Sequence, residues 1–385
     1  MKIAIASLGD PRSVSTWSGI PSNIVSALER RGHDMSGITL KLPPEPWYFN
    51  WLRRFHHHIN RKWFLGSVEA QWLKAISQQL DGQVNQIKPD VVLVVHGDWL
   101  AYATFDCPAC IIHDTTFASI VDYYPTFTNL TARSLRMGDT MYQRALDKSV
   151  AAVFSAQWAS HSAICQYGAP ESKVFTIPFG ANLVSAPTSE EVAMWTDCRA
   201  KSDCCNLVFI GTQWDRKGGP DALSVVAALN RWGIKSTLTV IGCAPEIPRE
   251  MKQHVRIVGY LDKSKPDDHS CFNALMQEAH ALIVLSHAEC YGCVYCEANA
   301  YGLPALARDT GGVSEIIRDG VNGLLLHAGE STESLAERWI NIWKNRDAYK
   351  RLAISSYREF AERLNYDVFV SKLEEVLLFS IQNNH

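Results

Sequence analysis

The sequence predicts an α/β fold made of two domains, each with a parallel sheet covered by helices. With 385 residues, the chain exceeds the size at which a single hydrophobic core usually stops growing. Short, continuous apolar runs alternate with helical patterns, as is typical of buried parallel strands joined by crossover helices. Two of these runs, at 206–210 and 281–285, lead through a glycine-containing loop into a helix.

The composition narrows the class of protein. Hydrophobic residues make up 47% of the chain, and the formal charge of −3 argues against a general nucleic-acid binder. The first apolar run, 1–9, is too short for the apolar region of a signal peptide, and no apolar run reaches the roughly 18 residues of a membrane span. We therefore expect a cytoplasmic protein whose eleven cysteines are reduced.

Strands and helices alternate in order along the chain, with a predicted linker and short helix at 185–202. Before the linker, the patterns predict strands at 1–9, 90–97, 109–112, 150–155 and 173–177, and helices at about 22–31, 67–87 and 129–148 and from 156. After it, they predict strands at 206–210, 236–242, 255–259 and 281–285, and helices from 220 and 293 and at 271–280, 331–345 and 367–379.

The most informative stretch follows the apolar run at 281–285. Glu289 lies in the loop, and Glu297 lies about one turn into the predicted helix. The backbone N–H groups of Gly292, Cys293 and Val294, at the start of this helix, are suited to hold a phosphate. Each carboxylate can accept two sugar hydroxyls, so the site suits a molecule with phosphates between two polyols. Taken singly, Glu297 could instead complement the helix dipole, and Glu289 could be a solvated loop residue.

This pattern of a Glu, seven residues, a second Glu and then Ala, with Gly-Leu-Pro soon after, resembles the donor-sugar motif of the retaining GT-B glycosyltransferases of family 4, the glycosyl transferases group 1. The resemblance continues in the sequence DTGGVSEIIRDGVNG at 309–323. It implies a GT-B fold, in which two Rossmann-like domains face each other across an interdomain cleft. The implied domains are an acceptor-side domain at 1–184 and a nucleotide-sugar domain at 203–365, with the C-terminal helix, 366–385, packing back on the first.

The run at 206–219 looks like the phosphate motif of the same family, in which a Gly-Arg pair is followed by Lys-Gly. Gly211 is a donor-binding candidate, and Lys217-Gly218 aligns with the Lys-Gly pair. The usual arginine position holds Thr212. Arg216 is the candidate to replace that arginine, although adjacent residues need not reach the same anion.

Three further site residues rest largely on the resemblance. Gly19, in the first strand–loop–helix unit, would face the donor diphosphate, and the backbone around Tyr260 would read the base. His113 follows a strand, where open α/β sheets place their sites, and is the candidate contact to the donor sugar or the acceptor. The alternative is that His113 is a loop or capping histidine, and Asp114 could be a helix N-cap.

The implied reaction is transfer of a hexose or related sugar, with retention, from a nucleoside-diphosphate sugar of the UDP or GDP type. Lys217, Arg216 and the amides at 292–294 would stabilise the leaving diphosphate, Glu289 would hold the donor sugar and Glu297 the ribose. No metal or other cofactor is expected, and the chain lacks the Asp-x-Asp motif of the other large transferase fold. The alternatives are a sugar-nucleotide epimerase on the same fold and a non-catalytic sugar-nucleotide-binding protein.

Two segments have unusual composition. Aromatic and basic residues interleave at 46–64, which suits peripheral contact with the inner face of a membrane and a glycan or lipid-linked acceptor of the cell envelope, or else an insertion that packs on the first domain. Cysteines separated by two intervening residues occur at 107 and 110, and at 290, 293 and 296. These spacings allow a zinc or iron–sulfur site, but the better explanation is that the cysteine side chains fill small apolar positions in the core.

Overall fold

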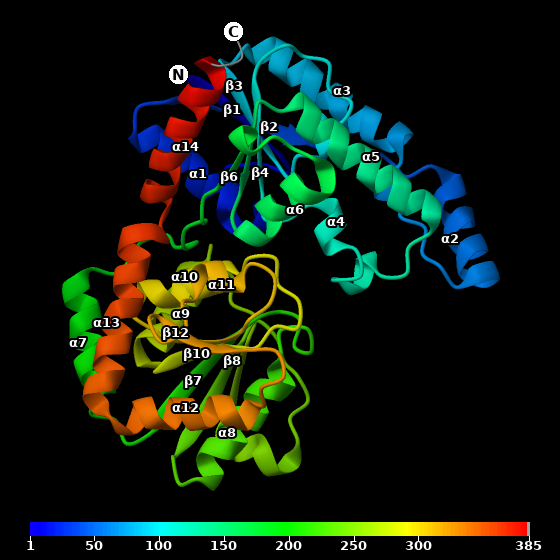
Figure 1. Cartoon of the computed structure of the whole chain (residues 1–385). Helices are drawn as coiled ribbons and strands as arrows, with labels where there is room; N and C mark the ends of the chain where they lie inside the picture. The colour runs from blue at the N-terminus through cyan, green and yellow to red at the C-terminus, as the bar shows by residue number, and fades with distance from the viewer. Residues whose placement is uncertain (383–385) are drawn as a thin grey trace. The chain divides into compact units, whose positions relative to one another are not determined.

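The chain forms two compact units, seen here in a computed structural model that describes residues 1–382 (Figure 1). Unit 1 contains Met1–Phe179 and the C-terminal segment from Tyr366, and unit 2 contains the residues from Gly180 to Asn365. Residues 383–385, the end of the expected C-terminal helix, lie outside the described residues. Each unit contains a six-stranded sheet in which all strands are parallel.

The sheet of unit 1 has the strand order β2-β1-β3-β4-β5-β6. Its strands are β1 (Lys2–Leu8), β2 (Asp34–Leu40), β3 (Val91–Val95), β4 (Ala109–His113), β5 (Ala151–Phe154) and β6 (Val174–Thr176). Every residue of β3, β4 and β5 is buried, because helices cover both faces of the sheet. The helices of unit 1 are α1 (Ile20–Arg30), α2 (Trp47–Asn60), α3 (Ala70–Ile87), α4 (Phe117–Ile120), α5 (Ala132–Lys148), α6 (Gln157–Tyr167) and α14 (Tyr366–Gln382).

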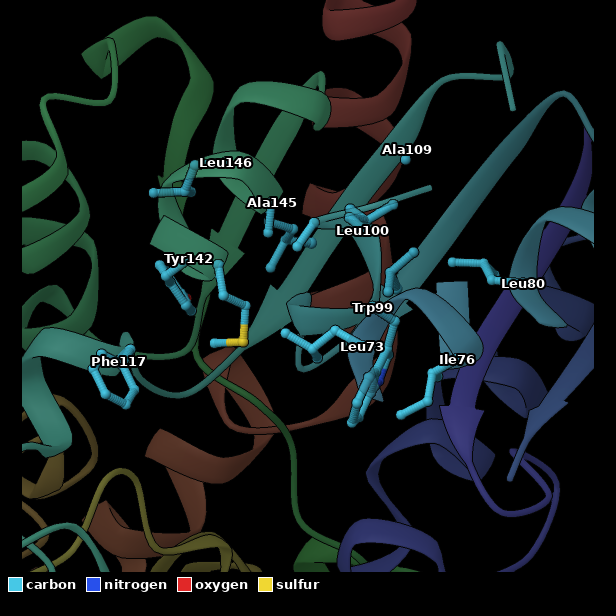
Figure 2. Close-up of a cluster of buried hydrophobic side chains, with 14 of the residues drawn as sticks. Leu73, Ile76, Leu80, Trp99, Leu100, Ala109, Phe117, Tyr142, Ala145 and Leu146 are labelled. Atoms are coloured by element: carbon cyan, nitrogen blue, oxygen red, sulfur yellow. The ribbon is translucent and has the colours of Figure 1, made fainter. Parts of the chain in front are cut away.

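The core of unit 1 lies between its sheet and the helices α3 and α5. Figure 2 shows buried apolar side chains from both helices directed toward the same layer, together with residues from the loop after β3. The labelled members are Leu73, Ile76, Leu80, Trp99, Leu100, Ala109, Phe117, Tyr142, Ala145 and Leu146. Burial of these side chains stabilises the packing of α3 and α5 on the sheet, and therefore the positions of the loops that follow its strands.

The helix α14 packs against α1 within unit 1. Glu374 of α14 accepts hydrogen bonds from Arg31 Nε, at 2.8 Å, and interacts with His33 Nε2, at 2.7 Å. The hydrogen bond from Arg31 lowers the pKa of the Glu374 carboxyl. The Phe369 ring lies 5.5 Å from that of Phe179. These contacts attach the end of the chain to the unit in which the chain begins.

The sheet of unit 2 has the order β12-β11-β10-β7-β8-β9. Its strands are β7 (Cys205–Ile210), β8 (Ser236–Ile241), β9 (Val255–Gly259), β10 (Ala281–Val284), β11 (Ala305–Arg308) and β12 (Gly323–Leu326). Its helices are α7 (Ser189–Arg199), α8 (Gly219–Arg231), α9 (Pro266–Glu278), α10 (Cys293–Ala300), α11 (Val313–Ile316), α12 (Thr332–Lys344) and α13 (Arg346–Arg363). The order reverses between β10 and β7, which is the place where open α/β sheets bind ligands, beyond the carboxyl ends of the strands.

The structure differs from the expected domain boundaries at the linker. The segment 185–202 contains α7, which packs on α13 and α9 of unit 2, and the units divide after Phe179. The buried Arg199 at the end of α7 explains this, because its guanidinium donates to the carbonyls of Gln277, Tyr301 and Gly302. A guanidinium held by three carbonyls inside unit 2 makes α7 part of that unit.

No helix within residues 1–382 is long and apolar enough to cross a membrane.

The buried His280 of unit 2 is held as a neutral imidazole. Its Nδ1 accepts the backbone N–H of Asn206 at 3.0 Å, so its hydrogen lies on Nε2, which is 3.2 Å from the carbonyl of Arg199. Burial, with a smaller contribution from the Arg199 charge, lowers the pKa of His280 to about 4. Protonation would place a second N–H against the N–H of Asn206.

The free energy of unfolding is therefore expected to fall as the pH decreases from about 6.5 toward 4. The unfolded chain binds a proton at His280 below its ordinary pKa near 6.5, whereas the folded chain does not until about pH 4. The contribution of His280 to stability is complete well above pH 6.5, and about 2.5 kcal/mol of it is lost by about pH 4.5. Urea unfolding followed by tryptophan fluorescence measures this loss, since Trp343 lies 4.8 Å from the His280 ring. His280→Gln, which cannot titrate, should show a shallower pH dependence, and an unchanged dependence would contradict the assignment.

Candidate functional site

The predicted strand, loop and helix around Glu289 are confirmed. The strand β10 ends at Val284, and α10 begins at Cys293, with Gly292 as its N-cap residue at a φ of 95°. A Cβ at Gly292 would lie 2.6 Å from the Tyr295 ring, so both the left-handed backbone and the close ring favour glycine here. The start of α10 therefore has the geometry of a helix N-terminus, the end of a helix toward which its backbone N–H groups point.

Two cations meet at Glu289, the buried loop carboxylate. The Nζ atom of Lys217 forms an ion pair with Oε2 of Glu289, and the Ser286 hydroxyl donates to the same oxygen at 3.0 Å. The Nη1 atom of Arg216 lies 3.7 Å from this oxygen and donates to the carbonyl of Ala288 at 2.6 Å. Arg216 and Lys217 therefore direct their charged groups to the same carboxylate, although they are adjacent in the sequence.

Glycines bring the loop of Lys217 close to the Glu289 loop. Gly218, the N-cap residue of α8, has a φ of 73°, and a Cβ there would lie 2.1 Å from the carbonyl oxygen of Leu285. A Cβ at Gly211 would lie 3.0 Å from Cγ of Lys217, so this glycine leaves room for the lysine side chain. The absence of side chains at these two positions lets the carboxyl ends of β7 and β10 share one cluster of charges.

The second carboxylate, Glu297, forms a separate ion pair. It is buried within α10, and its Oε2 lies 2.6 Å from Nζ of Lys263. The ammonium of Lys263 also lies 4.4 Å from the centre of the Phe272 ring. Lys263 lies in no sequence motif that would identify it as the partner of Glu297. Only its position, two residues after the Tyr260–Leu261 pair, suggests that it lies near the site. Tyr260 directly follows β9 and is 72% exposed.

The three cysteines at 290, 293 and 296 are not arranged as a metal-binding group among the described residues. Cys296 is buried in α10, its sulfur lies 3.6 Å from the Tyr291 hydroxyl, and burial raises its pKa to about 12. Cys107 donates instead to the carbonyl of Pro89 at 3.2 Å. Among residues 1–382, no group of three or more His, Cys, Asp or Glu side chains is arranged to hold a metal ion.

In unit 1, Gly19 is the N-cap residue of α1 and has a φ of 87°. Its carbonyl accepts hydrogen bonds from the Ser22 hydroxyl at 2.9 Å and the Asn23 amide at 2.8 Å. Trp17, two residues before Gly19, has a left-handed backbone, and its ring packs edge-on against His96 at 4.6 Å. Tryptophan rarely adopts a positive φ, so the loop at Trp17 is held in a constrained conformation beside the His96 ring.

His113, the last residue of β4, is buried and lies next to His96. The two rings stack at 4.9 Å, and the Tyr142 hydroxyl lies 3.5 Å from Nδ1 of His113. Burial, and secondarily the neighbouring His96, lowers the pKa of His113 well below its usual value, so the ring is neutral near pH 7. The N-cap of the following helix α4 is Thr116, which corrects the alternative that Asp114 caps it.

His96 is a residue that the sequence did not single out. It has a φ of 75°, and its Nε2 atom is buried without a hydrogen-bond partner, although part of the residue reaches the surface. Burial lowers its pKa to about 4. The nearby Asp98 has a pKa raised to about 7 by burial. Unit 1 therefore places two neutral imidazoles, and a carboxyl with a raised pKa, at the carboxyl ends of β3 and β4.

Residues 206–359 match the family described as glycosyl transferases group 1. A D-inositol 3-phosphate glycosyltransferase from Actinosynnema mirum is 31% identical over 183 residues, which cover 44% of this chain and 43% of that protein. The chain thus spans less than half the length of this curated relative. The family match at 206–359 lies within unit 2 and includes Lys217, Glu289 and Glu297.

Solved structures show that the fold is GT-B. The sucrose-phosphate synthase from Thermosynechococcus elongatus superposes with a TM-score of 0.70 at 15% identity over 99% of both chains. HepE from Anabaena, solved in complex with UDP, gives a TM-score of 0.65 at 17% identity over 98% of this chain and 99% of that chain. The fold and the family match together support a GT-B glycosyltransferase.

Proposed function

We propose that the protein is a retaining glycosyltransferase of family 4 that moves a hexose or related sugar from a nucleoside-diphosphate sugar to an acceptor hydroxyl. The observation that carries this proposal is the convergence of Lys217 and Arg216 on Glu289 at the carboxyl end of the sheet, beside the start of α10. The family match at 206–359 supports the same reaction class.

In this proposal the cationic cluster acts on the leaving group. When the glycosidic bond to the donor sugar breaks, its electron pair stays on the diphosphate, which gains negative charge. Lys217 and Arg216, held at Glu289, would exchange part of their contact with that carboxylate for the phosphate oxygens. The first amides of α10 would bind the same anion, and such preorganised donors cost no rearrangement during the reaction.

The two carboxylates would position the donor on either side of its phosphates. Glu289 would accept hydroxyls of the sugar and Glu297 those of the ribose, with Lys263 holding the Glu297 side chain in place. His113, being neutral, would contribute a hydrogen bond to sugar or acceptor rather than a charge. Attack from the face of the leaving group, with a phosphate oxygen accepting the acceptor's proton, would retain the anomeric configuration without a protein nucleophile or a metal ion.

The donor is proposed to carry UDP or GDP. The HepE structure contains UDP, which motivates UDP as the first nucleotide to examine. The loop at Tyr260, which lies three residues before Lys263, the partner of Glu297, is the proposed contact to the base. The acceptor is proposed to be a glycan or lipid-linked glycan of the cell envelope.

A second candidate function is binding of a sugar nucleotide without turnover. It is favoured by Thr212, which is exposed at the position where the family motif has arginine. The placement of the Arg216 guanidinium near Glu289 favours the enzyme instead, because a second cation is present there. Release of a glycosylated product distinguishes the two.

Thermal unfolding in the presence of UDP, GDP, ADP or CMP should identify the donor class. A ligand that binds only the folded state stabilises it by about 2.7 kcal/mol at a concentration of 100 Kd. We expect one diphosphate to raise the melting temperature and its sugar derivatives to be hydrolysed or transferred. Lys217→Ala should reduce the shift, whereas Lys350→Ala, which removes a partly exposed lysine paired with Asp197 at 2.7 Å, should not. No shift with any nucleotide would contradict the proposed function.

A further inference from the structure

The helix α2 carries a surface that the proposed reaction does not use. It is anchored on one side by Phe49, which is fully buried and lies 5.5 Å from the Phe64 ring. A Cβ at Gly66 would collide with Phe49 at 2.5 Å, so the contact is close. After the helix, the backbone of Trp63 exchanges hydrogen bonds with Asn129 and Thr131. The segment is therefore a fixed part of unit 1.

The opposite side of α2 exposes a row of large apolar side chains. Trp47, Trp51, Phe55 and Ile59 follow one another at intervals of four residues, and their exposed fractions are 83%, 56%, 44% and 66%. Residues four apart are neighbours on a helix surface, so the row is continuous over the length of α2, about 21 Å. The rings of Trp51 and Phe55 stack on each other at 5.1 Å. Figure 1 shows α2 at the periphery of unit 1, beyond α3 and α5.

The same surface is positively charged. Residues 46–64 contain two arginines in the helix, an arginine and a lysine directly after it, three histidines and no Asp or Glu. Arg53 is neutralised by Glu45, which it contacts through two hydrogen bonds of 2.6 and 2.7 Å. Arg54, within α2, and Arg61, directly after it, are exposed. The local charge is positive although the chain as a whole has a formal charge of −3.

We propose that α2 lies in the headgroup region of an anionic lipid bilayer, with Trp47, Trp51 and Phe55 inserted at the level of the headgroups and Arg54 and Arg61 against lipid phosphates. Tryptophan rings favour this interface, and an amphipathic helix lies along it with its apolar side inward. Cations next to that side add attraction to anionic lipid. The inference concerns unit 1 alone and does not depend on the proposed reaction.

Co-sedimentation of the full chain with vesicles tests this inference. The vesicles are made of phosphatidylcholine alone, or with about one third phosphatidylglycerol. We expect binding at least about tenfold tighter to the anionic vesicles. The double variant Trp51→Ser with Phe55→Ser should weaken binding by at least about tenfold, because it removes two inserted rings. Trp232→Ser, which changes an exposed tryptophan of unit 2, is the matched control and should bind as the unaltered protein does.

A second pair of variants tests the charge. Arg54→Glu with Arg61→Glu should weaken binding to the anionic vesicles by about tenfold or more, whereas Lys235→Glu with Lys252→Glu, an equal charge change at exposed positions of unit 2, should not. No binding of the unaltered chain, equal binding to both vesicle types, or equal loss in the control variants would overturn the proposal. The nucleotide-dependent thermal shift is measured on the same variants and should persist, so failure of this inference is distinguishable from failure of the proposed function.

Discussion

Replacing Lys217 by alanine is expected to lower the rate of sugar transfer by about 100- to 1,000-fold. The ammonium of Lys217 is largely buried and pairs with Glu289, so it is held at a defined position instead of moving freely in solvent. In such a site a cation acts at short range in a medium less polar than water, which increases its effect on a charge that develops in the transition state. Arg216 remains in the variant and accounts for residual activity.

The measurement is steady-state transfer with the donor that the nucleotide panel identifies, together with the melting temperature of each variant. Because the loss concerns the transition state, kcat should fall more than KM rises. The Lys350→Ala variant removes a partly exposed, ion-paired lysine and should keep its activity, since surface ion pairs contribute little. Full activity of a folded Lys217→Ala protein would exclude Lys217 from the site.

The sequence predicted much of the fold because several strands of the two sheets are short apolar runs. The runs at β3, β7 and β10 have no polar alternation, which only burial on both faces of a parallel sheet explains well. The strand β2 (Asp34–Leu40) was missed because it contains Asp, Ser and Gly and lies at the edge of its sheet. The helix α13 was missed because its apolar residues are spread among many charges.

Part of the candidate site was also predictable, because several of its residues lie in local sequence motifs. Lys217, Glu289 and Glu297 lie in motifs with glycines at fixed spacing, and the structure brings the first two together. Lys263 and His96 lie in no motif. Their roles depend on which loops the strand order places at the same edge of a sheet, and local patterns do not contain that information. The roles assigned to individual site residues stay predictions until the variants are measured.

Replacing Gly218 by alanine is expected to reduce the free energy of unfolding by about 3–5 kcal/mol, which is large for the addition of one methyl group. Two effects combine. The φ of 73° disfavours any residue with a Cβ, and the added carbon would lie 2.1 Å from the carbonyl oxygen of Leu285. The obstructing atom belongs to the backbone immediately after β10, so it cannot move aside as a flexible side chain would. Relief of the collision must separate the Lys217 loop from the loop that carries Glu289.

Gly233 provides the matched comparison because its φ is 80° and a Cβ there would meet nothing within 4 Å. Gly233→Ala isolates the backbone strain and should cost only about 1 kcal/mol. Urea unfolding of both variants gives the difference, and soluble yield serves as the readout if Gly218→Ala does not fold. Gly218→Ala should also lose nucleotide-dependent stabilisation, because the ion pair between Lys217 and Glu289 spans the two loops. Equal losses of stability in the two variants would mean that the close approach at Leu285 does not hold the cluster together.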